Sequence, residues 1–271
     1  MLRGMLSEKV PVFSKLSCDN KWWMHKLFES RELPVPHTEV YRDMEHAKAF
    51  VAKHKNIVVK PRSGAHGFGV QLNISNDNLL NTAVAKAKEF EDILLLQQQV
   101  GGRDLRILVV GNKIISAVER KPASVVGDGL HSVRELIKIE NTKEERGEVG
   151  IDALVKISEP AAKAYLTSAQ LEAVPLKDEE VRVVGPSNQS LGGRIVDALD
   201  SITPELHEQV TGLVAHLKMP IAGVDVILGS TQHYFIEVNA SPGIWIHDDN
   251  FAGVTSGCFG AYAKLLHEDT F

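Results

Sequence analysis

The chain has 271 residues, 44% of them hydrophobic, so it is long enough to bury a substantial core in one two-lobed domain or two small domains. A formal net charge of −5 argues against a broad nucleic-acid-binding face, although basic residues could still converge on a small anion such as a phosphate. No apolar run approaches the roughly 20 residues of a membrane helix, and no secretory signal is evident. We therefore expect a cytoplasmic protein without nucleic-acid or membrane partners.

The first hundred residues alternate between helical and extended patterns. Apolar residues at helical spacing, β-branched runs and glycine- or proline-rich stretches predict, in order, a helix at 19–33, a strand at 55–60, a glycine-bearing loop to 69, a strand from 70, a helix at 78–90, a strand at 93–96 and a connector at 97–102. This pattern indicates a sheet covered by helices.

The rest of the chain predicts a second sheet. We expect a hairpin of strands 105–110 and 113–120 around Gly111-Asn112, an irregular insertion at about 122–180 with a helix at 132–141, a helix from Thr203 to about 219, strands at 221–228 and 233–239, and a final helix within 253–267. We place an amino-terminal lobe at 1–100 and a carboxyl-terminal lobe at 101–271, and assign the fold class α+β.

Three oxygen-bearing side chains occupy the last predicted hairpin. Asp225 and Glu237 lie on its opposite arms, and Asn239 follows Glu237 by two residues, so the latter two face the same side of their strand. Two carboxylates and an amide on one sheet face suit a hard divalent cation, which prefers oxygen ligands. The bland alternative is a set of edge-strand polar residues facing water. Because Glu237 and Asn239 interrupt an apolar strand that leads into Ser241-Pro242-Gly243, we favour a Mg²⁺ site, with Mn²⁺ as an alternative ion.

A glycine-rich loop follows Lys60. Glycines allow backbone amides to fold over phosphate oxygens without a Cβ in the way, and Lys60 adds a positive charge. Such a loop alone is equally consistent with a structural turn, and its weight comes from Lys60 and the acidic hairpin downstream. The candidate phosphate-contacting residues of the loop are Ser63, Gly64, His66, Gly67 and Gly69.

Together these motifs resemble the ATP-grasp superfamily. The resemblance rests on Val59-Lys60-Pro61, His66-Gly67-Phe68-Gly69, Asn188-Gln189-Ser190-Leu191-Gly192-Gly193 and Glu237-Val238-Asn239-Ala240-Ser241-Pro242-Gly243. Through Glu119 to Ala123, Val125 to Gly129 and Arg134 to Ile137, the chain resembles in particular the ligase domain of cyanophycin synthetases and fused bacterial glutathione synthetases, and it is also similar to ribosomal-protein glutamate ligases.

The resemblance implies two α/β lobes that hold ATP between them. By position, Lys21 and Lys60 are similar to the lysines of the first lobe, and the segment from Gln97 and Gln98 to Val100 is similar to a hinge whose backbone meets adenine. Asp104 and Arg106 would face the ribose, the phosphates or the incoming substrate. The remaining implied residues are Asn188 and Arg194 opposite the triphosphate and Asp225, Glu237 and Asn239 as ligands of Mg²⁺.

The implied reaction is the ATP-dependent joining of a carboxylate to an amine, with an amino acid or short peptide as substrate. The carboxylate would form an acyl phosphate, which the amine then converts into an amide. Two alternatives stay open: a kinase of the same fold, and a catalytically impaired nucleotide-binding module. The oligomeric state is also open, with a homodimer as one alternative.

The chain also departs from the family pattern. Relatives have an acid in the hinge, where this sequence has Gln97-Gln98-Gln99, and an arginine two or four residues before the loop asparagine, where Pro186 and Val184 stand. We also expect most of the usual domain that precedes the ATP-grasp lobes to be lacking, because the first candidate lysine is already Lys21.

Overall fold

The computed structural model describes residues 10–64, 68–147, 154–185, 191–248 and 256–267. It divides into two compact units, of which the first comprises 1–115, 200–243 and 260–271 and the second 116–199 and 244–259. In the described ranges no helix is long and apolar enough to cross a membrane. Each unit combines several separate segments of the chain, whereas the predicted lobes at 1–100 and 101–271, with an insertion at about 122–180, are continuous stretches. The lobe boundaries stay a prediction.

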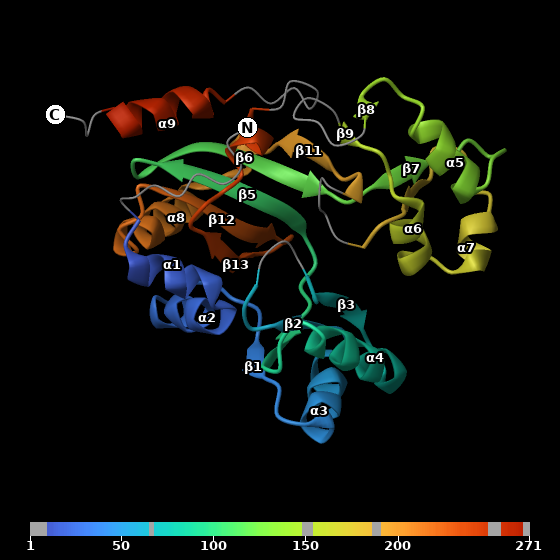
Figure 1. Cartoon of the computed structure of the whole chain (residues 1–271), viewed down its shortest axis with the longest axis horizontal. Helices are drawn as coiled ribbons and strands as arrows, with labels where there is room; N and C mark the ends of the chain where they lie inside the picture. Colours follow the sequence, from blue (N-terminus) through green and yellow to red (C-terminus); the bar gives the residue numbers. More distant parts are fainter. Residues whose placement is uncertain (1–9, 65–67, 148–153, 186–190, 249–255, 268–271) are drawn as a thin grey trace. The chain divides into compact units, whose positions relative to one another are not determined.

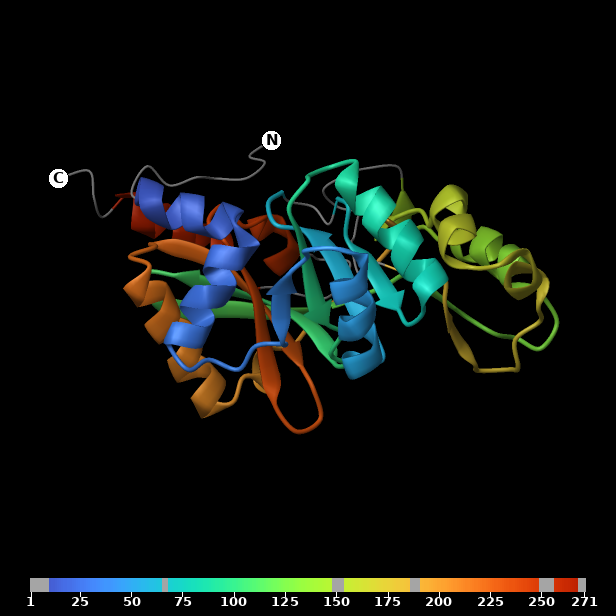
Figure 2. The same cartoon turned by 90° about the horizontal axis from the view of Figure 1, so that it is seen from below.

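The first unit contains a four-stranded antiparallel sheet in the order β1-β4-β2-β3. Its strands are β1 (Thr38–Val40), β2 (Ile57–Pro61), β3 (Gln71–Ile74) and β4 (Leu94–Gln98), and its helices are α3 (Met44–His54) and α4 (Asp77–Lys88). The side chains of Asp43 and Asn76 cap the two helices by accepting backbone N–H groups of their first turns. Both helices lie on the same side of this sheet (Figures 1 and 2).

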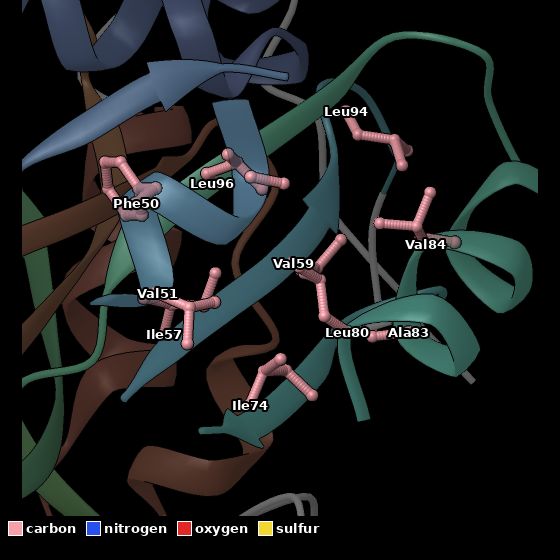
Figure 3. Close-up of a cluster of buried hydrophobic side chains, with 12 residues drawn as sticks. Phe50, Val51, Ile57, Val59, Ile74, Leu80, Ala83, Val84, Leu94 and Leu96 are labelled. Carbon is pink, nitrogen blue, oxygen red and sulfur yellow. The ribbon is translucent and has the colours of Figure 1, made fainter. Parts of the chain in front are cut away.

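Apolar side chains of these helices and strands form one core, in which Phe50 of α3 and Leu80 of α4 meet Val59 and Leu96 of the sheet (Figure 3). Because side chains alternate along a strand, the neighbours of Val59 and Leu96 point to the opposite face. The helix-covered face of β2 and β4 is therefore apolar, whereas Lys60 and Gln97 belong to the other face.

The first unit also contains three antiparallel strands in the order β5-β12-β13. They are β5 (Arg103–Val110), β12 (Ile221–Leu228) and β13 (His233–Asn239), joined in continuous ladders with one irregularity between Asp225 and Val226. Helices α1 (Val12–Asp19) and α2 (Lys21–Ser30) both contact β13. The remaining helices are α8 (Pro204–His216), which Thr203 caps as predicted, and α9 (Cys258–His267), whose last residues fall in this unit.

The second unit holds most of β6 (Lys113–Lys121), which the Gly111-Asn112 turn joins to β5. Both turn residues have positive φ, at 55° and 61°, as a tight two-residue hairpin turn requires. Strand β11 (Arg194–Asp197) pairs with β6, and β7 (Ser124–Val126) pairs with β10 (Glu180–Arg182). The other elements are β8 (Arg146–Gly147), β9 (Leu154–Val155), α5 (Val133–Glu140), α6 (Glu159–Tyr165), α7 (Ser168–Glu172) and the 3-10 turns η2 (Leu199–Ser201) and η3 (Ile244–His247).

Most predicted elements are present, with shifted ends. The predicted helix at 19–33 is shorter, because Asn20 rather than Asp19 accepts its first N–H groups and Asp19 ends a separate helix, α1. The predicted connector at 97–102 is wrong at its start, since Gln97 and Gln98 continue strand β4. Strand β1 and helix α3 had not been predicted.

Candidate functional site

The three predicted metal ligands come together on β12 and β13. Asp225 lies directly opposite Glu237 in the antiparallel ladder, and Asn239 lies two residues further along β13. Directly opposed residues and residues at i and i+2 share one face of a sheet, so the three side chains are neighbours. The structure thus contains the arrangement that the hairpin predicted. The role of these residues as metal ligands stays a prediction.

Arg106 on β5 extends this row across a third strand, because it pairs directly with Asp225. Its Nη2 donates to Oδ2 of Asp225 at 3.2 Å and its Nε donates to Oδ1, giving a two-pronged, charge-assisted contact. The strand order therefore places Arg106, Asp225 and Glu237 side by side. Arg106 stands at the carboxylate cluster, where it could reach an anion held there.

Gly223 lies on β12 where Pro242 and Arg106 approach the strand closely. A Cβ at this position would lie 2.8 Å from Cβ of Pro242 and 3.1 Å from Cδ of Arg106, which is too close for ordinary packing. The absent side chain leaves room for both residues against β12. Gly223 and the Ser241-Pro242-Gly243 turn therefore belong to one packed arrangement around Arg106 and Asp225.

Lys60 is buried on the face of β2 that lies away from α3 and α4, with 6% of its surface exposed. Its ammonium donates to Oε1 of Gln97 at 2.9 Å, Nε2 of Gln97 donates to the Thr38 hydroxyl at 2.8 Å, and that hydroxyl donates to the Pro36 carbonyl at 2.9 Å. Because the only proton of the Thr38 hydroxyl goes to Pro36, Thr38 can only accept from Gln97. This fixes the orientation of the Gln97 amide, whose oxygen must face Lys60.

The electrostatic surroundings of Lys60 weaken its hold on its proton. Burial lowers the pKa of Lys60 to about 8, an effect that the carboxylate of Glu237 opposes and the nearby charge of Lys21 reinforces. The Gln97 amide supplies a hydrogen bond but no negative charge. Lys60 therefore lacks a full countercharge on its own sheet, as expected for a cation that serves a bound anion.

Lys21 fastens the start of the glycine-rich loop. Its ammonium donates to the Gly64 carbonyl, its backbone N–H donates to the Arg62 carbonyl at 2.8 Å, and Asn20 and Ser63 form a short antiparallel bridge. From the other side, the Glu91 carboxylate accepts the Ser63 N–H at 2.6 Å.

At the far end of the loop, a Cβ on Gly69 would lie 2.7 Å from Cγ of Pro61, so only glycine fits there. Gly69 also has a φ of 73°. Hydrogen bonds thus define the first described end of the loop and close packing defines the second, whereas the candidates His66 and Gly67 lie outside the described residues.

Glu237 is the least satisfied group of the cluster. Burial, together with the charge of Asp225, raises its pKa, while the cations Lys21, Arg106 and Lys60 act in the opposite direction. In the part of the chain that the structure describes, its carboxylate takes part in no hydrogen bond, and the buried Nδ2 of Asn239 has no partner either. Buried polar groups are normally hydrogen-bonded, so Nδ2 of Asn239 and the neighbouring Glu237 carboxylate stay available to a bound group.

These unsatisfied groups fit a hard divalent cation next to phosphate oxygens. Carboxylate and amide oxygens are suitable ligands, and Asn239 could turn its amide to present either atom. The described residues contain no cluster of three His, Cys, Asp or Glu side chains that could hold a metal, so the candidate set depends on the Asn239 amide as its third member.

The predicted hinge residues lie at the end of strand β4 and just beyond it. Gln97 is buried in the contact with Lys60, and the backbone N–H of Gln98 donates to the His37 carbonyl at 2.8 Å. Val100 is half-buried at the end of this segment, and Asp104 lies on β5 opposite Ile227. Their predicted roles toward adenine and ribose stay predictions.

Arg194 belongs to the second unit, and Asn188 lies outside the described residues. Nη2 of Arg194 lies 2.6 Å from Glu140 and 2.8 Å from Glu145, and the fully buried side chain of Arg146 also contacts Glu140, at 2.9 Å. Burial alone would raise the pKa of Glu140, but hydrogen bonds from Lys143, Arg194 and Arg146 outweigh it and lower this pKa to about 2. Glu140 thus holds Arg194 in place as a permanent anion.

Thr38, Glu140 and Arg146 were not among the site residues predicted from the sequence. The helical pattern of Val133, Leu136 and Ile137 carries a signal for Glu140, since a residue three or four positions further along lies on the same buried face. A charged residue on such a face requires a partner. Thr38 gives no comparable signal, because its role depends on a contact with Gln97, 59 residues away.

Comparison with known proteins identifies the fold. Residues 18–145 match the RimK-like ATP-grasp domain family. This is the ATP-grasp fold. It is shared with the bifunctional glutathione synthetase of Pasteurella multocida, whose crystal structure superposes with a TM-score of 0.64 at 25% identity, over 96% of this chain and 37% of that one. The predicted fold class and the predicted superfamily are confirmed.

Two sequence relatives agree with the more specific resemblance. The chain is 29% identical to a cyanophycin synthetase of Nostoc sp. over 98% of its own length and 31% of the relative. It is 28% identical to the glutathione biosynthesis bifunctional protein GshAB of Listeria monocytogenes over 86% of its length and 32% of the relative. The ATP-grasp chain described here therefore spans about a third of the length of these relatives.

Proposed function

We propose that this ATP-grasp chain catalyses the ATP-dependent joining of a substrate carboxylate to an amine, with an amino acid or short peptide as the acid. The observation that carries the proposal is that the charges of Lys21, Lys60 and Arg106 act on the desolvated Glu237 carboxylate, beside the Asn239 amide whose buried Nδ2 has no partner in the described residues. A set of cations beside oxygen ligands suits a nucleotide triphosphate with its metal. The names of the relatives, cyanophycin synthetase and glutathione synthetase, support ligation as the outcome.

Each residue of the cluster has a proposed task. Lys60 and Lys21 contact phosphate oxygens, with the glycine-rich loop between Ser63 and Gly69 covering the phosphates through its backbone amides. The segment from Gln97 to Val100 lines the adenine, and Asp104 contacts the ribose. Asp225, Glu237 and Asn239 would hold one or two Mg²⁺ ions, which when bound would neutralise charge on the phosphates.

The proposed reaction has two steps. In the first, a carboxylate oxygen of the acid attacks the γ-phosphorus of ATP, the bond to the β-phosphate oxygen breaks, and ADP leaves. In the second, the amine nitrogen attacks the acyl carbon, inorganic phosphate leaves with the bonding electrons, and the nitrogen loses a proton. Such phosphoryl transfer depends mainly on alignment and on cations around the equatorial oxygens, which Lys60 and Arg106 supply in the first step.

The test is a matrix of amino acids and short peptides against amines, scored by ADP release and by the mass of the product. Ligation requires that ADP release depend on both an acid and an amine and that the product mass equal their sum less one water. Phosphorylated acid accumulating without amine would instead indicate a kinase. ATP binding without turnover across the whole matrix would indicate a nucleotide-binding module, and either result would overturn the proposal.

A further inference from the structure

A pocket of about 460 Å³ lies within the second unit, between α5 and the strands β6, β7 and β11. Its volume falls in the range of small-molecule sites, roughly 300 to 1,000 Å³. Leu136 and Ile139 of α5 and Val125 of β7 give it an apolar lining. Charged residues line the rest of the pocket, and their distribution between its two ends is informative.

One end of the pocket is cationic. Lys121 at the end of β6 lies directly opposite Arg194 at the start of β11, so their side chains share one face. Lys143, just beyond α5, joins them, and the Glu140 carboxylate holds both Arg194 and Lys143, at 2.6 and 2.7 Å. Lys121 forms no ion pair within the described residues. Glu145 also contacts Arg194, at 2.8 Å, so this end sets the three cations Lys121, Lys143 and Arg194 against two carboxylates and keeps a net positive charge.

The other end is acidic. Glu180 at the start of β10 lies opposite Val126 of β7, and Asp128 follows Val126 by two residues along the chain. Glu180 accepts a hydrogen bond from the Ser124 hydroxyl at 2.6 Å, and Asp128 accepts from the His131 ring at 2.6 Å. The His131 contact lowers the pKa of Asp128, so this carboxylate is ionised. Asp128 also accepts the backbone N–H groups of Leu130 and His131, whereas Glu180 accepts only from Ser124 among the described residues, so Glu180 is the more available acceptor at this end.

The separation of the two ends defines the size of a ligand. Five positions separate Lys121 from Val126, the partner of Glu180, and an extended chain advances about 3.3 Å per residue, so the ends are at most about 17 Å apart. This limit admits an extended peptide of up to about four residues. Its carboxylate suits the cationic end, its ammonium group the acidic end, and an apolar side chain the lining between them.

We propose that this pocket binds a short peptide as a zwitterion, with its C-terminal carboxylate at Lys121 and Arg194 and its N-terminal ammonium group at Glu180 and Asp128. The assignment of the bound peptide as the acid substrate rests on the proposed ligase function, whereas peptide binding itself does not. With that function, the acid substrate is a short peptide with both ends unblocked.

The binding test uses the full chain without nucleotide, titrated calorimetrically with Ala-Leu-Ala and with its N-acetylated and C-amidated forms. We expect the unblocked peptide to bind and either block to weaken binding about tenfold or more, as loss of a charge-assisted contact does. Equal binding of the blocked and unblocked peptides, or no binding of the unblocked one, would overturn the proposal.

Two variants assign the ends of the peptide. Lys121→Gln should weaken binding of the unblocked and N-acetylated peptides but leave the C-amidated peptide unchanged, and Glu180→Gln should show the reverse pattern. Both residues are exposed, and glutamine at 180 can still accept from Ser124, so folding should be preserved. Lys138→Gln and Glu144→Gln, exposed and outside the pocket lining, are the matched controls. A reversed or absent pattern would contradict the orientation.

Turnover then separates this proposal from the ligase proposal. Peptide binding with the expected end dependence but no ADP release with any amine would leave the pocket assignment standing and overturn the ligase function. ADP release that depends on an acid and an amine but is unchanged by Lys121→Gln and Glu180→Gln would overturn the pocket assignment and leave the ligase function standing.

Discussion

Two clusters of buried charge, one in each unit, differ in how completely they are paired. In the second unit, both carboxylate oxygens of Glu140 are occupied by Lys143, Arg146 and Arg194, and the pKa of Glu140 lies at about 2. In the first unit, the half-buried Glu237 accepts no hydrogen bond from any described residue, and desolvation raises its pKa. Fully paired charges can stabilise a fold without a ligand, whereas buried charges left unpaired destabilise it unless something binds. We therefore infer that the pair of Glu140 and the buried Arg146 supports the fold, and we keep ligand binding at Glu237 as a proposal.

The sharpest test of this comparison is Glu237→Ala. We expect ADP release to fall on the order of a thousandfold or more, since a single electrostatic group at a phosphoryl-transfer site contributes this much. The free energy of unfolding should stay the same or rise, because the variant removes a desolvated carboxylate that accepts no hydrogen bond from the described residues. Parallel assays of ADP release and urea unfolding check both parts. Undiminished ADP release would contradict the metal-ligand assignment.

Glu140→Gln should destabilise the fold, in contrast to Glu237→Ala. The substitution leaves the fully buried guanidinium of Arg146 without its countercharge, so we expect the free energy of unfolding to fall by about 3–5 kcal/mol. Urea denaturation measures the change. The control Glu144→Gln lies at an exposed position nearby and should shift stability by less than about 0.5 kcal/mol. Equal stability of the two variants would show that the network does not support the fold.

Thr38→Val tests the contact that orients Lys60. Without the hydroxyl, the Gln97 amide can turn its NH₂ group toward the Lys60 ammonium, and we expect the KM for ATP to rise about 10- to 100-fold with a smaller change in kcat. Thr38→Ser keeps the hydroxyl and should restore the KM. If serine and valine give the same KM, the effect comes from packing and not from the hydrogen-bond chain.

The smallest expected effect is a pH dependence from Lys60, whose pKa is about 8 in the folded chain against an ordinary value of 10.5. ATP affinity should weaken by up to about tenfold between pH 7 and 9, as the ammonium loses its proton.

Between pH 8 and 10.5 the unfolded chain binds more protons at this site, so the free energy of unfolding should rise with pH relative to Lys60→Met. Nucleotide titrations and urea unfolding at several pH values measure the two trends. An unchanged pH profile in Lys60→Met would assign the titration to another group.

Local patterns in the sequence determined a large part of this molecule. The alternation of Glu237 and Asn239, the β-branched run before Lys60, the Gly111-Asn112 turn and the Thr203 cap each depend on neighbours within a few residues. Such signals are readable because strand alternation, turn conformation and helix capping are local properties. They suffice to bring Asp225 and Glu237 together, since one short hairpin joins their strands.

Only the tertiary structure decided which charges are paired. Gln97 looked like part of a connector because it is polar, yet it continues β4, where Thr38 and Lys60 satisfy its amide inside the protein. Glu140, Arg146 and Arg194 meet across 54 positions of the chain, and no local pattern specifies that meeting. Pairing of buried charges depends on contacts between distant segments, and these contacts give Glu140 three cationic partners while Glu237 accepts no hydrogen bond from the described residues.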